Sequence, residues 1–165
     1  MKVAIISDLH DNIPYLDIFL SFCKQHKINK LLITGDVGSL ETLLQIPEAL
    51  FKKIYFVFGN ADNFSPADIP PYIISLGESG IIKFENKHIG LCHEPEKIAG
   101  LLKDKPDIIF YGHTHKPWVN VEGKTLIINP GTLGGVFTAS TFAVWDLARP
   151  APELIRTDEL DNPKY

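Results

Sequence analysis

The stretch Ile108-Ile109-Phe110-Tyr111-Gly112-His113-Thr114-His115-Lys116-Pro117 decides how the rest of the chain is interpreted. Its first three residues form a short apolar run that predicts a buried strand. His113 and His115 follow, and side chains two residues apart point the same way in extended chain. Gly112 lets the backbone bend and Pro117 ends the pairing, so the histidines are expected on a rigid rim at the strand's C-terminal end. That geometry suits metal ligands, although an HxH pair alone favours the simpler interpretation of two half-exposed strand residues.

Outward from this stretch, the first third of the chain alternates apolar runs with helical patterns. Strands are expected over 3–6, 31–33 and 54–58, because each run is short and β-favouring. Asn12 can cap a helix with apolar residues at helical spacing, and Ser39 starts a second helix that Pro47 interrupts. The alternation predicts a parallel sheet covered on both faces, with its site at the carboxyl ends of the strands.

The second half of the chain predicts a mixed sheet. Residues 81–84 and 88–92 flank a short polar turn and are typical of a hairpin, and a short helix is expected over 95–103. A further hairpin is expected from 119–121 with 125–128. Closing strands are expected at 142–145 and 154–155. Prolines 66, 70 and 71 mark a stretch expected to be irregular.

Length and composition indicate one compact domain, over residues 1–157, followed by a polar C-terminal tail over 158–165. The net charge of -4 argues against stable binding of nucleic acid or of an anionic membrane surface. Cys23 and Cys92 fall at apolar positions and are expected to fill the core, which fits a reducing cytoplasm. We therefore expect a cytoplasmic protein without a membrane span, and a homo-oligomer remains an option.

Seven residues that can bind metal come at the ends of apolar runs. They are Asp8, His10, Asp36, Asn60, His93, His113 and His115. Each alone could equally be a helix cap, a turn residue or a surface group. Together they require many coincidences, and His26 and His88, which lack this placement, serve as internal controls.

These residues carry a resemblance to the calcineurin-like metallophosphoesterases, within them the small single-domain prokaryotic phosphodiesterase group. The DxH, GD, GN, lone histidine and GHTH blocks of that family are similar, in order, to Asp8-Leu9-His10, Gly35-Asp36, Gly59-Asn60, His93 and Gly112 to His115. Asn129-Pro130-Gly131-Thr132 is similar to a segment often found in the small group. The resemblance implies an α/β fold, an α/β/β/α sandwich of two mixed sheets flanked by helices. It also implies that Asp8, His10 and His115 hold one metal, that Asn60, His93 and His113 hold the other, and that Asp36 bridges them.

The donor types support such a centre independently of the resemblance. Imidazole, carboxylate and amide donors suit borderline divalent ions, with manganese favoured and nickel, iron, cobalt or zinc as alternatives. Two ions about 3.5–4 Å apart activate a bridging water and clamp phosphoryl oxygens. Against their positive charges, Asp8 and Asp36 bring only two negative ones, so the centre stays positive. An acidic protein can thus bind a small phosphate-ester substrate. The resemblance implies that the activity is hydrolysis of phosphate diesters.

Two departures from the family pattern bear on catalysis. Many relatives have His directly after the GN pair, placed to protonate the leaving group, whereas this chain has Ala61 followed by Asp62. Asn60 and Asp62 are the residues expected to act on the substrate, with Asp62 as the candidate acid. Glu94-Pro95 replaces the usual glycine-containing turn after the lone histidine.

Other classes of protein remain to be weighed. A non-catalytic scaffold on the same fold is the main alternative, because the resemblance extends to the retromer subunit, which works chiefly through its surface. A dinucleotide-binding module is excluded because the first turn lacks a glycine fingerprint. A barrel-type amidohydrolase usually needs about 250 residues, more than this chain has.

Overall fold

The computed structural model describes residues 1–160 of the chain. The strands are β1 (Lys2–Ile6), β2 (Lys30–Ile33), β3 (Lys53–Phe56), β4 (Ile73–Ser75), β5 (Ser79–Phe84), β6 (Lys87–Cys92), β7 (Ile108–Phe110), β8 (Trp118–Glu122), β9 (Thr125–Asn129), β10 (Thr141–Asp146) and β11 (Glu153–Arg156). The helices are α1 (Ile13–Gln25), α2 (Leu40–Leu43) and α3 (Ile98–Leu101), with 3-10 turns η1 (Pro66–Asp68), η2 (Pro95–Lys97), η3 (Leu102–Asp104) and η4 (Thr157–Glu159).

Two mixed sheets form the centre of the molecule. The first has the strand order β11-β10-β1-β2-β3-β4, in which β1 to β4 are parallel and β10 is antiparallel to both of its neighbours, β1 and β11. The second has the order β5-β6-β7-β9-β8, with β6, β7 and β9 parallel and antiparallel hairpins at both edges. Both predicted hairpins are confirmed.

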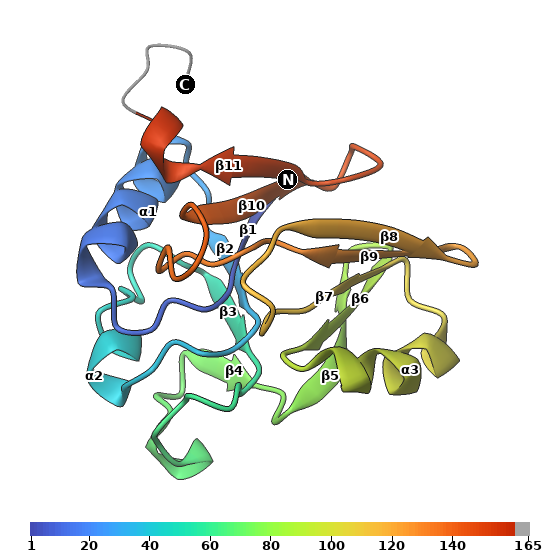
Figure 1. Cartoon of the computed structure of the whole chain (residues 1–165), viewed down its shortest axis with the longest axis horizontal. Coiled ribbons are helices and arrows are strands. Elements are labelled where there is room, and N and C mark those ends of the chain that lie inside the picture. Colours follow the sequence, from blue (N-terminus) through green and yellow to red (C-terminus); the bar gives the residue numbers. More distant parts are fainter. Residues whose placement is uncertain (161–165) are drawn as a thin grey trace.

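The sheets pack face to face between helices, which confirms the α/β/β/α sandwich. Side chains alternate along β1: Ala4 and Ile6 pack in the cluster that contains the buried face of α1, whereas Val3 and Ile5 face the second sheet. On the outer face of the second sheet, Ile109 packs in a smaller cluster with residues of α3. Figure 1 shows α1 and α3 on opposite sides of the strands. One face of the first sheet is therefore covered by helices and the other by the second sheet.

The predicted helix starts are correct in position, but one capping role is wrong. Helix α1 begins directly after Asn12, whose side chain makes no cap hydrogen bond; its Nδ2 donates to the Gly134 carbonyl at 2.8 Å. Asn12 thus ties the start of α1 to the loop between β9 and β10. Ser39 does cap α2, because its Oγ accepts from Thr42 N at 3.3 Å, but that helix ends at Leu43, before Pro47.

The stretch predicted to be irregular contains a strand. β4 follows Pro70 and Pro71 and pairs in parallel with β3 over three residues. Its place at the edge of the sheet explains how a strand follows two prolines, since neither proline has to donate a ladder hydrogen bond. The helix expected over 95–103 is present as the succession η2, α3 and η3.

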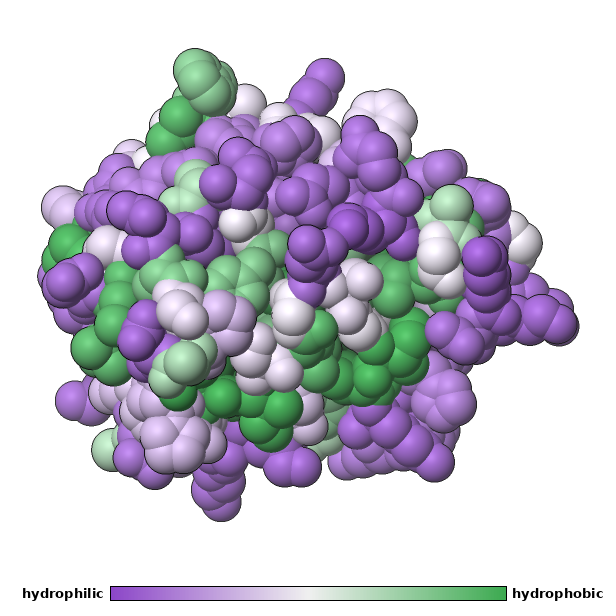
Figure 2. Space-filling view, turned by 90° about the horizontal axis from the view of Figure 1, so that it is seen from below, coloured by the Kyte–Doolittle hydropathy of each residue, from purple (hydrophilic) through white to green (hydrophobic). Residues whose placement is uncertain are grey.

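The remaining expectations concern the surface and the tail. Cys23 and Cys92 are free thiols and both are buried, as predicted. Within residues 1–160, no helix combines the length and the apolar character that crossing a membrane requires. Figure 2 shows one face of the molecule, on which a band of hydrophobic side chains runs between hydrophilic ones. Of the expected tail, Asp158 and Glu159 belong to η4, and residues 161–165 lie outside the described residues.

Candidate metal centre

The candidate metal ligands lie at one end of the two sheets, in the loops that follow the carboxyl ends of the parallel strands. They are Asp8 and His10 after β1, Asp36 after β2, Asn60 after β3, His93 after β6, and His113 and His115 after β7. The two control histidines lie elsewhere. The ring of His26 stacks on Phe22 with centroids 4.1 Å apart, and His88 is exposed on β6.

Asp8, His10 and His115 form one compact group of donor atoms. His115 Nε2 lies 3.2 Å from Asp8 Oδ1 and 3.1 Å from His10 Nε2. His10 Nε2 is 3.9 Å from the same carboxylate oxygen. Asp8 and His115 are buried, and His10 is partly exposed. Three donor atoms at this spacing can share one cation.

Asp8, Asp36 and His93 form a second group, and all three are buried. His93 Nε2 lies 3.2 Å from Asp36 Oδ2, and the same oxygen is 3.9 Å from His10 Nε2. Asp36 therefore lies between a histidine of each group, and Asp8 belongs to both. The two groups adjoin each other and share the carboxylate of Asp8.

Asn60 and His113 lie on the exposed side of the second group. Asn60 Oδ1 is 2.9 Å from His113 Nδ1. The His93 and His113 rings are nearly perpendicular, at 83°, with centroids 5.2 Å apart. Since Asn60 and His113 are both exposed, this is the side from which a ligand in solution can approach.

The hydrogen bonds of the two buried histidines test whether a cation fits. His93 Nδ1 lies 2.8 Å from the Thr34 carbonyl oxygen, and His115 Nδ1 lies 3.1 Å from the Val136 carbonyl oxygen. Because a carbonyl only accepts, each Nδ1 carries the hydrogen and each Nε2 of the neutral ring presents a lone pair. His93 Nε2 is buried and has no hydrogen-bond partner among residues 1–160. A lone pair that faces a carboxylate is repelled unless a proton or a metal ion lies between them. Metal-binding histidines adopt this orientation, so the donors fit a metal.

Mutual proximity shifts the pKa values of these groups. Burial raises the pKa of Asp8, and the neighbouring Asp36 adds to the rise, against the effects of Ser7, His93 and His115. Burial also acts to raise the pKa of Asp36, but His93, the Ala61 N–H and His10 hold it below its usual value. Burial opposes a charge on His93, yet the two carboxylates raise its pKa. Concentrated negative charge thus attracts a proton or a cation to this point.

Glycines at this end allow the loops to approach each other closely. A Cβ at Gly59 would lie 2.1 Å from Asp36 Oδ1, and one at Gly112 would lie 2.0 Å from Ser7 Oγ and 2.9 Å from Asp8 Oδ2. No side chain fits at either position, so only glycine can occupy these positions of the GN and GHTH blocks.

The backbone at the site differs from what the sequence predicts for the histidine pair. His113 and His115 have φ angles of 69° and 58°, in the left-handed region, so the segment is not extended. The expectation that they point the same way is therefore wrong: His115 joins Asp8 and His10, whereas His113 contacts Asn60. Asp8, His10 and Asp36 also have positive φ. Backbone strain of this kind collects at functional sites.

Asp62 occupies a position that its sequence context does not reveal. Its Oδ2 accepts hydrogen bonds from the backbone N–H groups of Asp36 at 3.0 Å and Gly59 at 2.8 Å, and its Oδ1 accepts from Gly38 N at 3.1 Å. Burial raises its pKa, although these three N–H groups oppose the rise. The carboxylate fastens the loop after β2 to the loop after β3, and both its oxygens are engaged in doing so.

Two further residues support the site without any metal-binding pattern of their own. Asn129 Nδ2 donates to the Gly112 carbonyl at 2.8 Å, and Thr132 Oγ1 donates to the Asp8 carbonyl at 2.7 Å. The segment from Asn129 to Thr132 stands out in the sequence only by its resemblance to the small phosphodiesterase group. Its role depends on a contact between residues 124 positions apart in the sequence, and a local sequence pattern cannot reveal such a contact.

Comparisons with known proteins agree with this geometry. The sequence pattern of the calcineurin-like phosphoesterase superfamily domain matches residues 1–149. The phosphodiesterase YfcE of Escherichia coli is 26% identical over 149 residues, which cover 81% of this chain and 79% of that protein.

Solved structures share the fold. A structure described as a novel archaeal phosphodiesterase has a TM-score of 0.83 at 22% identity and covers 94% of this chain and 99% of its own. Vps29 of Entamoeba histolytica, solved in complex with zinc, has a TM-score of 0.70 at 24% identity and covers 94% of this chain and 98% of its own.

Proposed function

The chain belongs to the calcineurin-like phosphoesterase superfamily, and on that basis we propose that it is a phosphodiesterase that works with two divalent metal ions. One observation carries the proposal: two adjoining groups of buried donor atoms share Asp8, and a buried His93 nitrogen with no hydrogen-bond partner among residues 1–160 is directed at Asp36. Such an arrangement supports two cations held side by side.

The proposed ligands divide between the two ions. Asp8, His10 and His115 hold the first ion, whereas Asn60, His93 and His113 hold the second. Asp36 serves both, which its place between His10 and His93 supports. The mixture of nitrogen and oxygen donors suits borderline divalent ions, among which we propose manganese, with zinc, iron, cobalt or nickel as alternatives.

The side chains of the chain then position a phosphate ester and the water that attacks it. When bound, the two ions lower the pKa of a water molecule and neutralise charge on the phosphoryl oxygens. Asn60 and His113 line the exposed side, where the ester enters. A site that is positive only at its metal centre suits a small phosphate ester better than a long polyanion, since the whole chain has a net charge of -4.

Protonation of the leaving group is where this chain departs from many relatives. Ala61 has no proton to give, and both oxygens of Asp62 accept backbone hydrogen bonds. We therefore assign Asp62 to positioning the two loops, in place of the acid role expected from the sequence. Esters whose leaving group is stable without a proton, such as aryl diesters, are the substrates this site suits.

A hydrolysis screen of the metal-depleted chain tests the proposal. The chain is reconstituted with manganese, zinc, cobalt or nickel and offered phosphomonoesters, phosphodiesters and cyclic nucleotides. We expect hydrolysis only with added metal and fastest with an aryl diester. Metal binding without hydrolysis of any of the three classes would contradict the proposal.

The alternative function is a non-catalytic scaffold that binds metal. The likeness to Vps29 favours it, because that protein also binds zinc on this fold. The same screen separates the two functions: a scaffold binds metal and hydrolyses nothing.

A further inference from the structure

Phe137 is a hydrophobic residue placed where folding does not require one. Its side chain is 93% exposed, the largest fraction among the exposed large hydrophobic residues of the described chain. An aromatic ring in solvent forgoes the stabilisation that burial would contribute. Its φ of 65° lies in the left-handed region, which bulky residues seldom adopt. Both features cost stability and neither contributes to the core, which makes Phe137 a candidate for a role other than folding.

The loop that carries Phe137 is fastened to the candidate metal centre on both sides of it. The carbonyl of Val136 accepts from His115 Nδ1 at 3.1 Å, and Thr138 Oγ1 donates to the His115 carbonyl at 2.8 Å. Earlier in the loop, Gly134 N donates to the Asp8 carbonyl at 3.0 Å. The position of Phe137 is therefore set by two candidate ligands.

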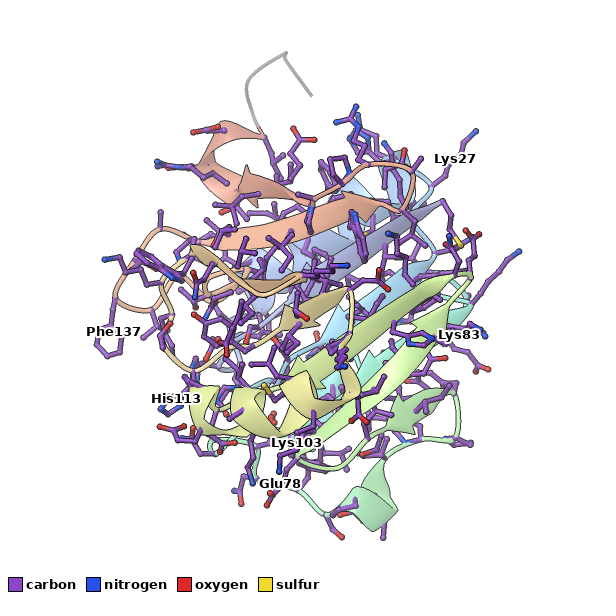
Figure 3. All side chains as sticks on the ribbon, turned by 90° about the vertical axis from the view of Figure 1, so that its right-hand side faces the viewer. Lys27, Glu78, Lys83, Lys103, His113 and Phe137 are labelled. Carbon is purple, nitrogen blue, oxygen red and sulfur yellow. The ribbon has the colours of Figure 1, made fainter. Side chains whose placement is uncertain are left out.

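The ring itself lies beside the first group of ligands. Its centroid is 5.5 Å from that of His115, with the two planes inclined at 36°. One part of the ring contacts the imidazole, and the remainder faces solvent. Figure 3 shows Phe137 and His113 projecting from the same edge of the molecule. An open aromatic face at the rim of a phosphoester site is what stacking of a planar group requires.

We propose that Phe137 determines specificity by stacking on a planar aromatic group of the substrate, a nucleobase or an aryl ring, while the phosphoryl group occupies the metal centre. This inference rests on the proposed phosphodiesterase function and narrows its substrate class. Residues 130–140, which form the loop, contain neither Lys nor Arg, so the loop offers no cation to a second phosphate. Stacking is the recognition that its chemistry provides.

The test uses ligands that carry one organic group each. The metal-loaded full chain and its Phe137→Ala variant are titrated by calorimetry with phenyl phosphate, thymidine 5′-phosphate and methyl phosphate. We expect the wild type to bind at least one aromatic ligand about 5–20-fold more tightly than methyl phosphate, the lower range for aromatic stacking. The variant should lose this preference while it binds methyl phosphate as before. Comparison of the phenyl and thymidine arms identifies the aryl ring or the nucleobase as the preferred group.

Two further variants distinguish aromatic stacking from the effect of apolar bulk, and a thermal melt distinguishes it from an effect on folding. Phe137→Trp should keep the preference and Phe137→Leu should lose it, because leucine is apolar but has no aromatic face. The thermal midpoint of Phe137→Ala should not fall, since the side chain is exposed and its backbone strained.

Four outcomes would overturn the inference. Equal affinity of the wild type for all three ligands, or a preference that survives in Phe137→Ala, would contradict stacking while leaving the phosphodiesterase intact. A variant that changes only the oligomeric state in size-exclusion chromatography would place Phe137 in a contact between copies of the chain. Absence of binding by all three ligands, together with absence of hydrolysis, would remove the proposed function and the inference with it.

Discussion

Strand β6 has a histidine near each end, and the two have opposite surroundings. His88 is exposed, and its backbone N–H donates to Asp107 Oδ2 at 2.8 Å in an ordinary hairpin. His93, just past the carboxyl end of the strand, is fully buried. Its Nδ1 is held by the Thr34 carbonyl at 2.8 Å, which leaves Nε2 directed at Asp36.

The position of a histidine in the sheet, more than its residue type, therefore determines whether it can bind a metal ion in this molecule. At the end that carries His93, loops from both sheets converge so closely that Gly59 and Gly112 leave no space for a Cβ. Left-handed residues and buried carboxylates also gather there. Features that lower stability are concentrated at the end where a metal would restore it. At the His88 end, Glu85 and Lys105 also have positive φ, but the carboxylate beside His88, that of Asp107, is exposed.

Removal of the carboxylate that we propose to serve both ions, that of Asp36, should have the largest effect on the candidate metal centre. Asp36→Asn takes a negative charge from between the two groups of donors. Because loss of a residue that merely supports a ligand costs about 10–100-fold, we expect a loss of more than about 100-fold in diester hydrolysis, together with lower metal content. Steady-state kinetics and elemental analysis of the same preparation measure both. A variant that keeps two metals and most of its activity would show that Asp36 is not shared.

A matched pair of exposed histidines sharpens the comparison. His113 and His88 are both exposed, so neither alanine variant opens a cavity in the core. His113→Ala should lower activity by about 10–100-fold, whereas His88→Ala should leave it unchanged. Thermal melts with and without manganese form the second readout, and the gain from metal should shrink only in His113→Ala. Equal effects in the two variants would contradict the claim that only the histidine at the candidate metal centre contributes to activity.

Asp62 tests whether the loops at this end depend on a shared acceptor. Asp62→Asn keeps the shape of the side chain but replaces one accepting oxygen with an NH2 group, which cannot accept from a backbone N–H. We expect a loss of about 1–3 kcal/mol in the free energy of unfolding and weaker metal binding. Denaturant titration and metal calorimetry measure the two effects. If Asp62 were instead the catalytic acid, stability and metal affinity would be kept and only turnover of poor leaving groups would fall.

Much of this end could be predicted from the sequence, and the rest could not for physical reasons. Asp8, Asp36 and His93 stand out because each ends an apolar run, and such runs report strands reliably. The role of Asp62 depends on backbone donors 24 and 26 residues away, for which the sequence carries no periodic signal. β4 has only three residues and closely follows two prolines, so it is too short to show the apolar pattern that predicts a strand. The stacking role proposed for Phe137 arises from a loop conformation that tertiary hydrogen bonds impose.

A further prediction concerns the leaving group. Without a histidine at position 61, the rate should depend steeply on the pKa of the departing alcohol, because general acid catalysis, typically worth about 10²–10⁴-fold, is missing. A series of substituted phenyl and alkyl diesters gives the slope. Ala61→His should flatten it wherever the imidazole reaches the leaving oxygen. A shallow slope in the wild type that becomes steep in Asp62→Asn would identify Asp62 as the acid, and a shallow slope in both proteins would reveal a different proton donor.

The measurement that tests the central claim most directly is the metal content of the purified chain. The chain is loaded with excess manganese, desalted, and analysed for metal and protein together, in the wild type and in the Asp36→Asn and His88→Ala variants. We expect two ions per chain in the wild type and in His88→Ala, and fewer in Asp36→Asn. A wild type that retains no ion, or three proteins with the same metal content, would contradict it.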